Sequence, residues 1–229
     1  MIPLAALMHF TPASQVYALA YSVGILVFCL FAQKRRLLTE GIGYVAMTGL
    51  IGGLLGANVG QFLATSGGTG KSVLGGILGG YLAVMLAKKR LGLVRPTGDL
   101  FAVALMAGEA VGRWGCFLGG CCGGRECTLP WAIAGHHPTQ LYLSAACALI
   151  FVLLLVAETY RRPAENGLWY LQGVLYCPAR FVIEFFRDGA TRHGGLSTAQ
   201  WACLVGFVFF VYKLAKEKPF ATVSTLPLP

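Results

Sequence analysis

Seven long apolar runs constrain this chain more than any other feature of its sequence. A helix of about 17–25 residues crosses the hydrocarbon core of a membrane, and the runs lie at about 15–33, 42–64, 72–88, 99–118, 138–157, 167–185 and 197–214. Charged residues make up 12% of the chain, against about 25% in soluble domains. Because only helices or closed barrels satisfy the backbone in lipid, and barrel-like alternation is missing from the sequence, we predict an all-α polytopic membrane protein with seven transmembrane helices.

The positions of lysine and arginine predict the orientation of these helices. Of the eighteen basic residues, twelve fall in loops on one side: Lys34, Arg35, Arg36, Lys88, Lys89, Arg90, Arg95, Arg161, Arg162, Lys213, Lys216 and Lys218. The positive-inside rule makes that side the cytoplasm, so we expect the N-terminus outside and the C-terminus in the cytoplasm. We also expect one domain over residues 1–218, a disordered cytoplasmic tail at 219–229 and no cleavable signal. Topology accounts for most of the net charge of +9, so we expect no nucleic-acid partner.

Charged side chains inside the predicted helices indicate a functional site, because a charge at membrane depth is costly. Glu109 and Arg113 are four residues apart, and so are Arg180 and Glu184, so that each pair shares one helical face. One interpretation is a pair of structural ion pairs. For the two arginines we favour function, since a guanidinium in the outer half of the membrane binds a phosphate through two parallel hydrogen bonds.

Residues 112–124 read GRWGCFLGGCCGG and contain three of the eight cysteines. With one more they form a possible thiol site at the outer face: Cys116, Cys121, Cys122 and Cys127. A disulfide in this loop, for example Cys122 with Cys127, is the simplest account; free thiols, a redox switch or a cysteine nucleophile that carries an acyl group as a thioester are alternatives. Zinc sites usually have paired C-x2-4-C spacings, which C-x4-C-C-x4-C does not match, so we expect no metal ion.

Five motifs, in the right order, resemble those of the prolipoprotein diacylglyceryl transferase family, whose members are seven-helix bacterial membrane enzymes. GRWGCFLGGCCGG is similar to the family's GRxGNFxNGExxG, and HPTQLY at 137–142 resembles HPSQLYE. YCPARFVIEFFR at 176–187 resembles YGxxRFxxEFFR, STAQ at 197–200 resembles SxGQ, and YALAYSVG at 17–24 resembles YGLMYLVG. The resemblance covers roughly residues 15–215 and agrees with the predicted helix count and orientation.

The resemblance implies an enzyme of the bacterial inner membrane that needs no cofactor. It would move the sn-1,2-diacylglyceryl group of phosphatidylglycerol onto a lipobox cysteine thiol of a prolipoprotein and release glycerol phosphate. The family's essential arginines match Arg113 and Arg180, and its tyrosines match Tyr17 and Tyr176. We expect His137 to be the base for the thiol, as the nearest titratable group in a family motif. The residues that we expect to bind substrate are Gly112, Gly115, Gln140, Tyr142, Glu184 and Arg187.

Several positions depart from the family's motifs, most of them on the acceptor side. The histidine of the family's FHGG falls on Leu74, and an arginine near the outer end of its second helix appears as Asn58. The two asparagines and the glutamate of its GRxGN-type motif fall on Cys116, Gly119 and Cys121, and its large loop is reduced to residues 124–136. Two alternatives therefore stay open. One is a divergent paralogue that uses another acceptor with cysteine participation, and the other is a non-enzymatic membrane protein that binds lipid or senses thiols or metals.

Overall fold

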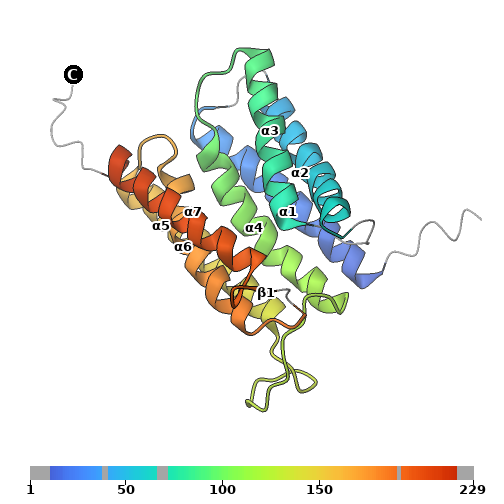
Figure 1. The fold of residues 1–229 in the computed structure, drawn as a ribbon. Coiled ribbons are helices and arrows are strands. Elements are labelled where there is room, and N and C mark those ends of the chain that lie inside the picture. Colours follow the sequence, from blue (N-terminus) through green and yellow to red (C-terminus); the bar gives the residue numbers. More distant parts are fainter. Residues whose placement is uncertain (1–10, 38–40, 66–71, 190–191, 221–229) are drawn as a thin grey trace, which may run out of the picture. The chain divides into compact units, whose positions relative to one another are not determined.

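Helices dominate the part of the chain that the computed structural model describes, residues 11–37, 41–65, 72–189 and 192–220 (Figure 1). The described helices are α1 (Pro12–Lys34), α2 (Ile42–Thr65), α3 (Val73–Leu91), α4 (Gly98–Leu118), α5 (Thr139–Arg161), α6 (Gly167–Phe185) and α7 (Thr198–Glu217). Two short strands, β1 (Arg192–His193) and β2 (Leu196–Ser197), pair antiparallel before α7. The all-α prediction is confirmed, and each predicted run forms one helix. Residues 221–229 of the expected tail and the side chain of Leu74 lie outside the described part.

Five of the described helices are long and apolar enough to cross a membrane: α1, α2, α4, α5 and α7. The other two are 19 residues long. Three basic residues, Lys88–Arg90, form the last turn of α3, while α6 carries Arg180 and Glu184. The chain is therefore a multi-pass helical membrane protein.

The chain forms two compact units, and the smaller one, residues 28–96, is built on the α2–α3 hairpin. Glycines on the two helices face one another at close range: a Cβ on Gly56 would lie 2.3 Å from the carbonyl oxygen of Gly75. A similar close approach relates Gly52 and Gly79. Small residues three and four apart permit such backbone contact in membranes. The glycine pattern of this region thus packs one helix against the other.

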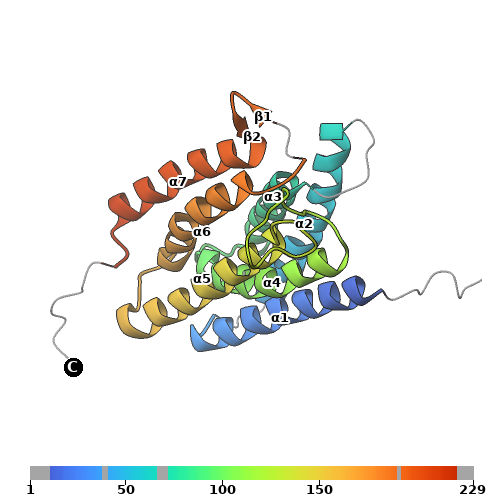
Figure 2. The same cartoon turned by 90° about the horizontal axis from the view of Figure 1, so that it is seen from below.

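The larger unit comprises residues 1–27 and 97–229, and α6 lies at its centre. Helix α6 packs against α4, α5 and α7, and Figure 2 shows α5, α6 and α7 side by side. Gly173 lets α6 approach the Phe210 ring of α7, which would lie 2.1 Å from a Cβ at that position. Because α6 has neighbours on several sides, its polar residues Gln172, Arg180 and Glu184 are buried within the unit.

The loop between α4 and α5 folds back onto the end of α6. Gly124 forms an isolated bridge with Arg187, and Glu126 forms one with His136. Cys127 N–H donates to the carbonyl oxygen of Gly135, which closes the loop on itself. The loop therefore holds the start of α5 and the end of α6 together above the charged residues of α4 and α6.

Candidate functional site

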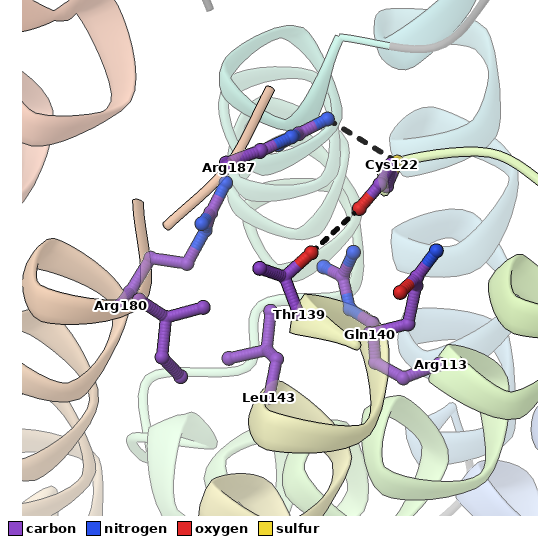
Figure 3. Close-up of a pocket in the computed structure, with 8 residues that line it drawn as sticks. Arg113, Cys122, Thr139, Gln140, Leu143, Arg180 and Arg187 are labelled. Carbon is purple, nitrogen blue, oxygen red and sulfur yellow. Dashed lines mark hydrogen bonds between the residues drawn. The ribbon is translucent and has the colours of Figure 1, made fainter. Parts of the chain in front are cut away.

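Three arginines from different segments of the larger unit converge on one small pocket (Figure 3). Arg113 comes from α4, Arg180 from α6, and Arg187 from the turn after α6. The other lining residues are Cys122, Thr139, Gln140, Leu143 and Ile183. The two arginines that the sequence singled out, 67 positions apart in the chain, therefore face the same space.

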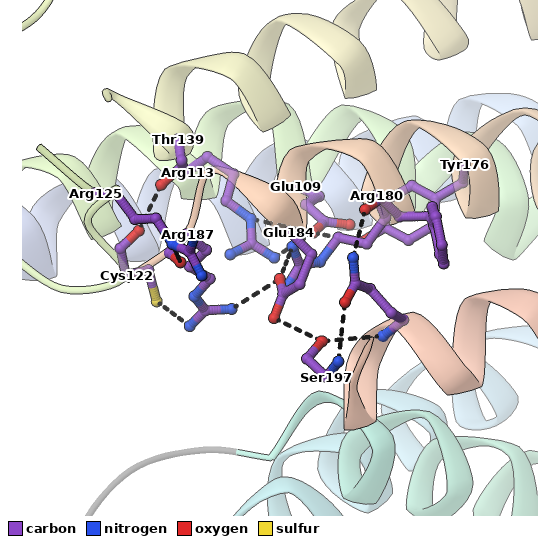
Figure 4. Close-up of polar contacts among 12 residues, drawn as sticks. Glu109, Arg113, Cys122, Arg125, Thr139, Tyr176, Arg180, Glu184, Arg187 and Ser197 are labelled. Carbon is purple, nitrogen blue, oxygen red and sulfur yellow. Dashed lines mark hydrogen bonds and ion pairs between the residues drawn. The ribbon is translucent and has the colours of Figure 1, made fainter. Parts of the chain in front are cut away.

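The carboxylate of Glu109 orients Arg113, and a phenol holds that carboxylate. Its Nε lies 3.1 Å from Oε1 of Glu109, and its Nη2 also contacts that oxygen. The hydroxyl of Tyr176, on α6, donates to the same oxygen at 3.0 Å. The i,i+4 spacing read from the sequence thus forms an ion pair, which Tyr176 links to the neighbouring helix (Figure 4).

A second carboxylate lies between the other two arginines. Glu184 is 3% exposed; its Oε2 forms an ion pair with Nη1 of Arg180 and lies 3.7 Å from Nη1 of Arg187. Its other oxygen accepts a hydrogen bond from the Ser197 hydroxyl at 3.2 Å. Ser197 is itself fixed as the N-cap of α7 in a capping box with Gln200. The start of α7 therefore holds the carboxylate that positions Arg180.

The balance of charge favours an anion in this pocket. Three guanidinium groups are matched by the carboxylates of Glu109 and Glu184, which leaves one positive charge in a largely buried place. A buried charge is costly unless it is paired. Guanidinium groups form parallel hydrogen bonds with phosphate oxygens, so a phosphate is a fitting counter-ion.

Three of the four clustered cysteines lie next to this pocket. The Sγ atoms of Cys116, Cys121 and Cys122 are all within 4.8 Å of one another. The hydroxyl of Tyr17 donates to Sγ of Cys116 at 3.4 Å and lies 3.9 Å from Sγ of Cys121. Tyr17, expected among the catalytic residues, therefore contacts the thiols.

The expected disulfide between Cys122 and Cys127 is not formed. All eight cysteines lie in the described residues, and each is a free thiol. Sγ of Cys122 instead accepts from Nη2 of Arg187 at 3.2 Å, and Sγ of Cys127 accepts from Leu129 N–H at 3.4 Å. A hydrogen bond with the Cys116 thiol and burial raise the pKa of the Cys122 thiol above its ordinary value, while Arg187 acts in the opposite direction. The loop is held by hydrogen bonds and bridges rather than by a disulfide.

His137 and Tyr142 form a separate group beside the pocket. Nδ1 of His137 lies 3.2 Å from the Tyr142 hydroxyl, and its ring is 4.9 Å from that of Phe186. The Tyr142 hydroxyl also accepts from Nε1 of Trp131 at 2.9 Å. Neither His137 nor Tyr142 is among the lining residues. The structure thus brings together most of the residues expected at the site but leaves this pair at its edge.

The two motif glycines serve the packing of α1 on α4. A Cβ on Gly115 would lie 2.8 Å from the Tyr17 ring, and one on Gly112 would lie 3.5 Å from the Ala20 side chain. Gly115 therefore makes room for the tyrosine that reaches the thiols. Sequence reasoning missed Thr139 and Ser197 as site residues, although the S-x-x-Q capping signature at 197–200 marked the latter.

The fold and the pocket together define a class: a multi-pass helical membrane protein with an arginine-lined pocket. Over residues 6–215 the chain matches the family described as prolipoprotein diacylglyceryl transferase. Since the match covers most of the chain, the protein belongs to this family of transferases.

Relatives from several bacteria carry the name phosphatidylglycerol–prolipoprotein diacylglyceryl transferase. One from Finegoldia magna is 33% identical over 169 residues, covering 70% of this chain and 67% of the relative. One from Clostridium tetani is 29% identical over 237 residues, covering 88% and 94%. One from Polynucleobacter necessarius is 33% identical over 208 residues, covering 82% and 79%. The similarity to these three relatives thus extends over 70–88% of this chain.

Proposed function

We propose that this protein transfers the diacylglyceryl group of phosphatidylglycerol to the lipobox cysteine thiol of a prolipoprotein and releases glycerol phosphate. Family membership and the names of the relatives support the reaction. The observation that carries the proposal is the pocket in which Arg113, Arg180 and Arg187 converge with one charge in excess of their carboxylate partners. A phospholipid headgroup supplies the phosphate that such a pocket fits.

The arginines would act most strongly when the phosphate leaves. As the bond between the glyceryl carbon and the phosphate oxygen breaks, negative charge grows on the departing phosphate. Donors that are already oriented stabilise this charge without reorganising. Glu109 and Tyr176 would keep Arg113 in place, and Glu184 with Ser197 would keep Arg180 in place.

The incoming thiol has to lose its proton before or during the attack. We propose His137 as the proton acceptor. Its imidazole is held by the Tyr142 hydroxyl and the Phe186 ring, and it lies two residues before Thr139 of the pocket. Gln140 and Arg187 would contact the headgroup, since both line the pocket.

We further propose that α1 to α7 all span the bacterial inner membrane, with the N-terminus outside, the C-terminus in the cytoplasm and the pocket near the outer face. The basic loops support this orientation. A cysteine-free variant with single cysteines placed at Leu129 and at Arg162 tests it in intact spheroplasts. An impermeant maleimide should label the first position only; labelling of the second alone would reverse the proposed orientation.

The direct test of the function uses labelled phosphatidylglycerol, a lipobox peptide and the protein in proteoliposomes. We expect the label to move to the peptide, and Arg113→Ala to reduce transfer by about 10²–10³-fold, as for the loss of one donor to a developing oxyanion. Arg161→Ala, an exposed arginine in the last turn of α5, is the matched control and should leave transfer unchanged. Equal activity of both variants would contradict the role of the pocket.

A further inference from the structure

The three thiols at the end of α4 are arranged as a metal site that the proposed reaction does not yet use. We infer that Cys116, Cys121 and Cys122 bind one Zn²⁺ ion through three thiolates and leave its fourth position open for the thiol of the acceptor. This inference rests on the proposed function. It also revises the expectation of no metal. That expectation rested on the sequence spacing of four cysteines, whereas the structure brings three of their sulfur atoms together without Cys127.

The chain turns sharply after α4 to bring the second and third cysteines back over the first. Gly120 and Cys122 both have positive φ, +66° and +61°. For a non-glycine residue this left-handed conformation costs roughly 1–2 kcal/mol, and such strain persists where the surroundings impose it. The N–H of Cys121 donates to the carbonyl oxygen of Cys116, which closes the turn. The backbone thus adopts a costly conformation that gathers three sulfur atoms.

The start of α5 fixes this turn in place. Gln140 Nε2 donates to the carbonyl oxygen of Cys121 at 2.7 Å, and Thr139 Oγ1 donates to that of Cys122 at 2.8 Å (Figure 3). Both side chains also line the arginine pocket. The same two side chains therefore fix the thiols relative to the pocket. The reaction requires such a fixed arrangement, because the attacking thiol would bind at the cysteines and the departing phosphate in the pocket.

The spacing of the sulfur atoms suits a thiophilic ion. Tetrahedral zinc with Zn–S bonds of about 2.3 Å places its sulfur ligands about 3.8 Å apart, and these three lie within 4.8 Å of one another without an ion. A small inward movement of each cysteine side chain would shorten the sulfur–sulfur distances to those of a zinc site. A disulfide would join only two sulfurs at about 2.05 Å and would give the third thiol no role.

The surroundings supply hydrogen-bond donors to two of the three sulfur atoms. Three thiolates and Zn²⁺ carry a net charge of −1, and a bound acceptor thiolate makes it −2. Arg187 Nη2 donates to Sγ of Cys122 at 3.2 Å (Figure 4). The Tyr17 hydroxyl donates to Sγ of Cys116 at 3.4 Å. Donors to ligand atoms tune a metal and fix its geometry. Arg187 lines the phosphate pocket as well, so it links the two sites.

The open position gives the site its chemistry. A zinc site with three protein ligands keeps a place for a substrate, and a thiol that coordinates zinc is deprotonated outright. The acceptor thiol would lose its proton to solvent, with His137 as the proposed first acceptor. Its sulfur would then attack the glyceryl carbon: the C–S bond forms, the C–O bond breaks, and the electron pair leaves with the oxygen of glycerol phosphate. The three cysteines keep their ion, and the neutral thioether leaves.

Cobalt spectroscopy of the full chain tests the site without relying on activity. The protein is purified in detergent under argon, freed of metal and titrated with Co²⁺. We expect one equivalent to bind, with sulfur-to-cobalt charge-transfer absorption that Zn²⁺ abolishes. A lipobox peptide should shift the visible bands, and the same peptide with serine for its cysteine should not. Missing charge-transfer absorption, or bands that the cysteine peptide leaves unmoved, would overturn the inference.

Variants separate the three ligands from the fourth cysteine. Cys121→Ser should weaken Co²⁺ binding by more than about tenfold, while Cys127→Ser, in the same loop, should bind as the parent does. Because Cys121 is exposed, its serine variant should fold, and its metal-free unfolding temperature checks this. Equal binding by both variants would overturn the assignment.

Transfer assays on the same preparations keep this inference apart from the proposed function. Zinc loading should restore transfer to metal-free protein. If metal-free protein transfers at the loaded rate, the role of the metal is overturned and the proposed function stands. If a preparation whose cobalt form gives the expected spectrum transfers nothing when it is loaded with zinc instead, both the proposed function and the acceptor role are overturned.

Discussion

Replacing Arg180 with lysine separates the shape of the guanidinium from its charge. Arg180 is 6% exposed and forms an ion pair with Glu184 while it lines the pocket. A lysine ammonium keeps the charge, so Glu184 keeps a counter-ion and the fold should survive. However, a single ammonium lacks the planar fork that serves a carboxylate and a phosphate at once.

The expected loss follows from that geometry. Arg180→Lys forfeits about one hydrogen bond to a charged group, worth roughly 1.5–3 kcal/mol, which corresponds to a roughly 10- to 160-fold fall in kcat. Because the lost bond strengthens as charge grows on the leaving phosphate, kcat should fall more than KM rises. Initial rates with labelled phosphatidylglycerol and a lipobox peptide measure both, and Arg161→Lys is the control. A kcat within twofold of the parent's would refute the role given to Arg180.

Three further predictions concern charge, packing and the base. Glu184→Gln removes the carboxylate shared by two arginines and should lower stability by about 3–5 kcal/mol, seen as a lower Tm; an unchanged Tm would contradict this pairing. Gly56→Ala should disrupt the α2–α3 hairpin, because its Cβ would lie 2.3 Å from a backbone oxygen, while Gly43→Ala, with nothing within 4 Å, should be tolerated; equal melting curves would argue against close packing. His137→Ala should slow transfer near pH 7 and recover near pH 9, where a free thiol ionises by itself; a pH-independent deficit would exclude it as the base.

The helices could be predicted because their signals are local. An apolar run of spanning length and the i,i+4 spacing of Glu109 and Arg113 both depend only on neighbours in sequence. The glycine pattern of α2 and α3 was readable for the same reason, and the close approach of Gly56 to Gly75 follows from it. Order along the chain also let the motifs place Arg113 and Arg180 in one site.

Contacts that depend on the path of a loop could not be predicted. The turn after α4 decides which cysteines meet, and its left-handed residue Cys122 gives no signal in the sequence. For this reason a Cys122–Cys127 disulfide was expected, although Cys122 contacts Arg187 instead. The position of His137 beside Tyr142 likewise depends on how the 124–136 loop closes.

Mass spectrometry of a lipobox peptide tests the central claim most directly. The peptide is incubated with the purified protein in vesicles that contain phosphatidylglycerol. The account predicts that the peptide gains one diacylglyceryl group on its cysteine sulfur, with an equal amount of glycerol phosphate released. An unmodified peptide beside folded protein, or the same gain on a peptide with serine for cysteine, would contradict it.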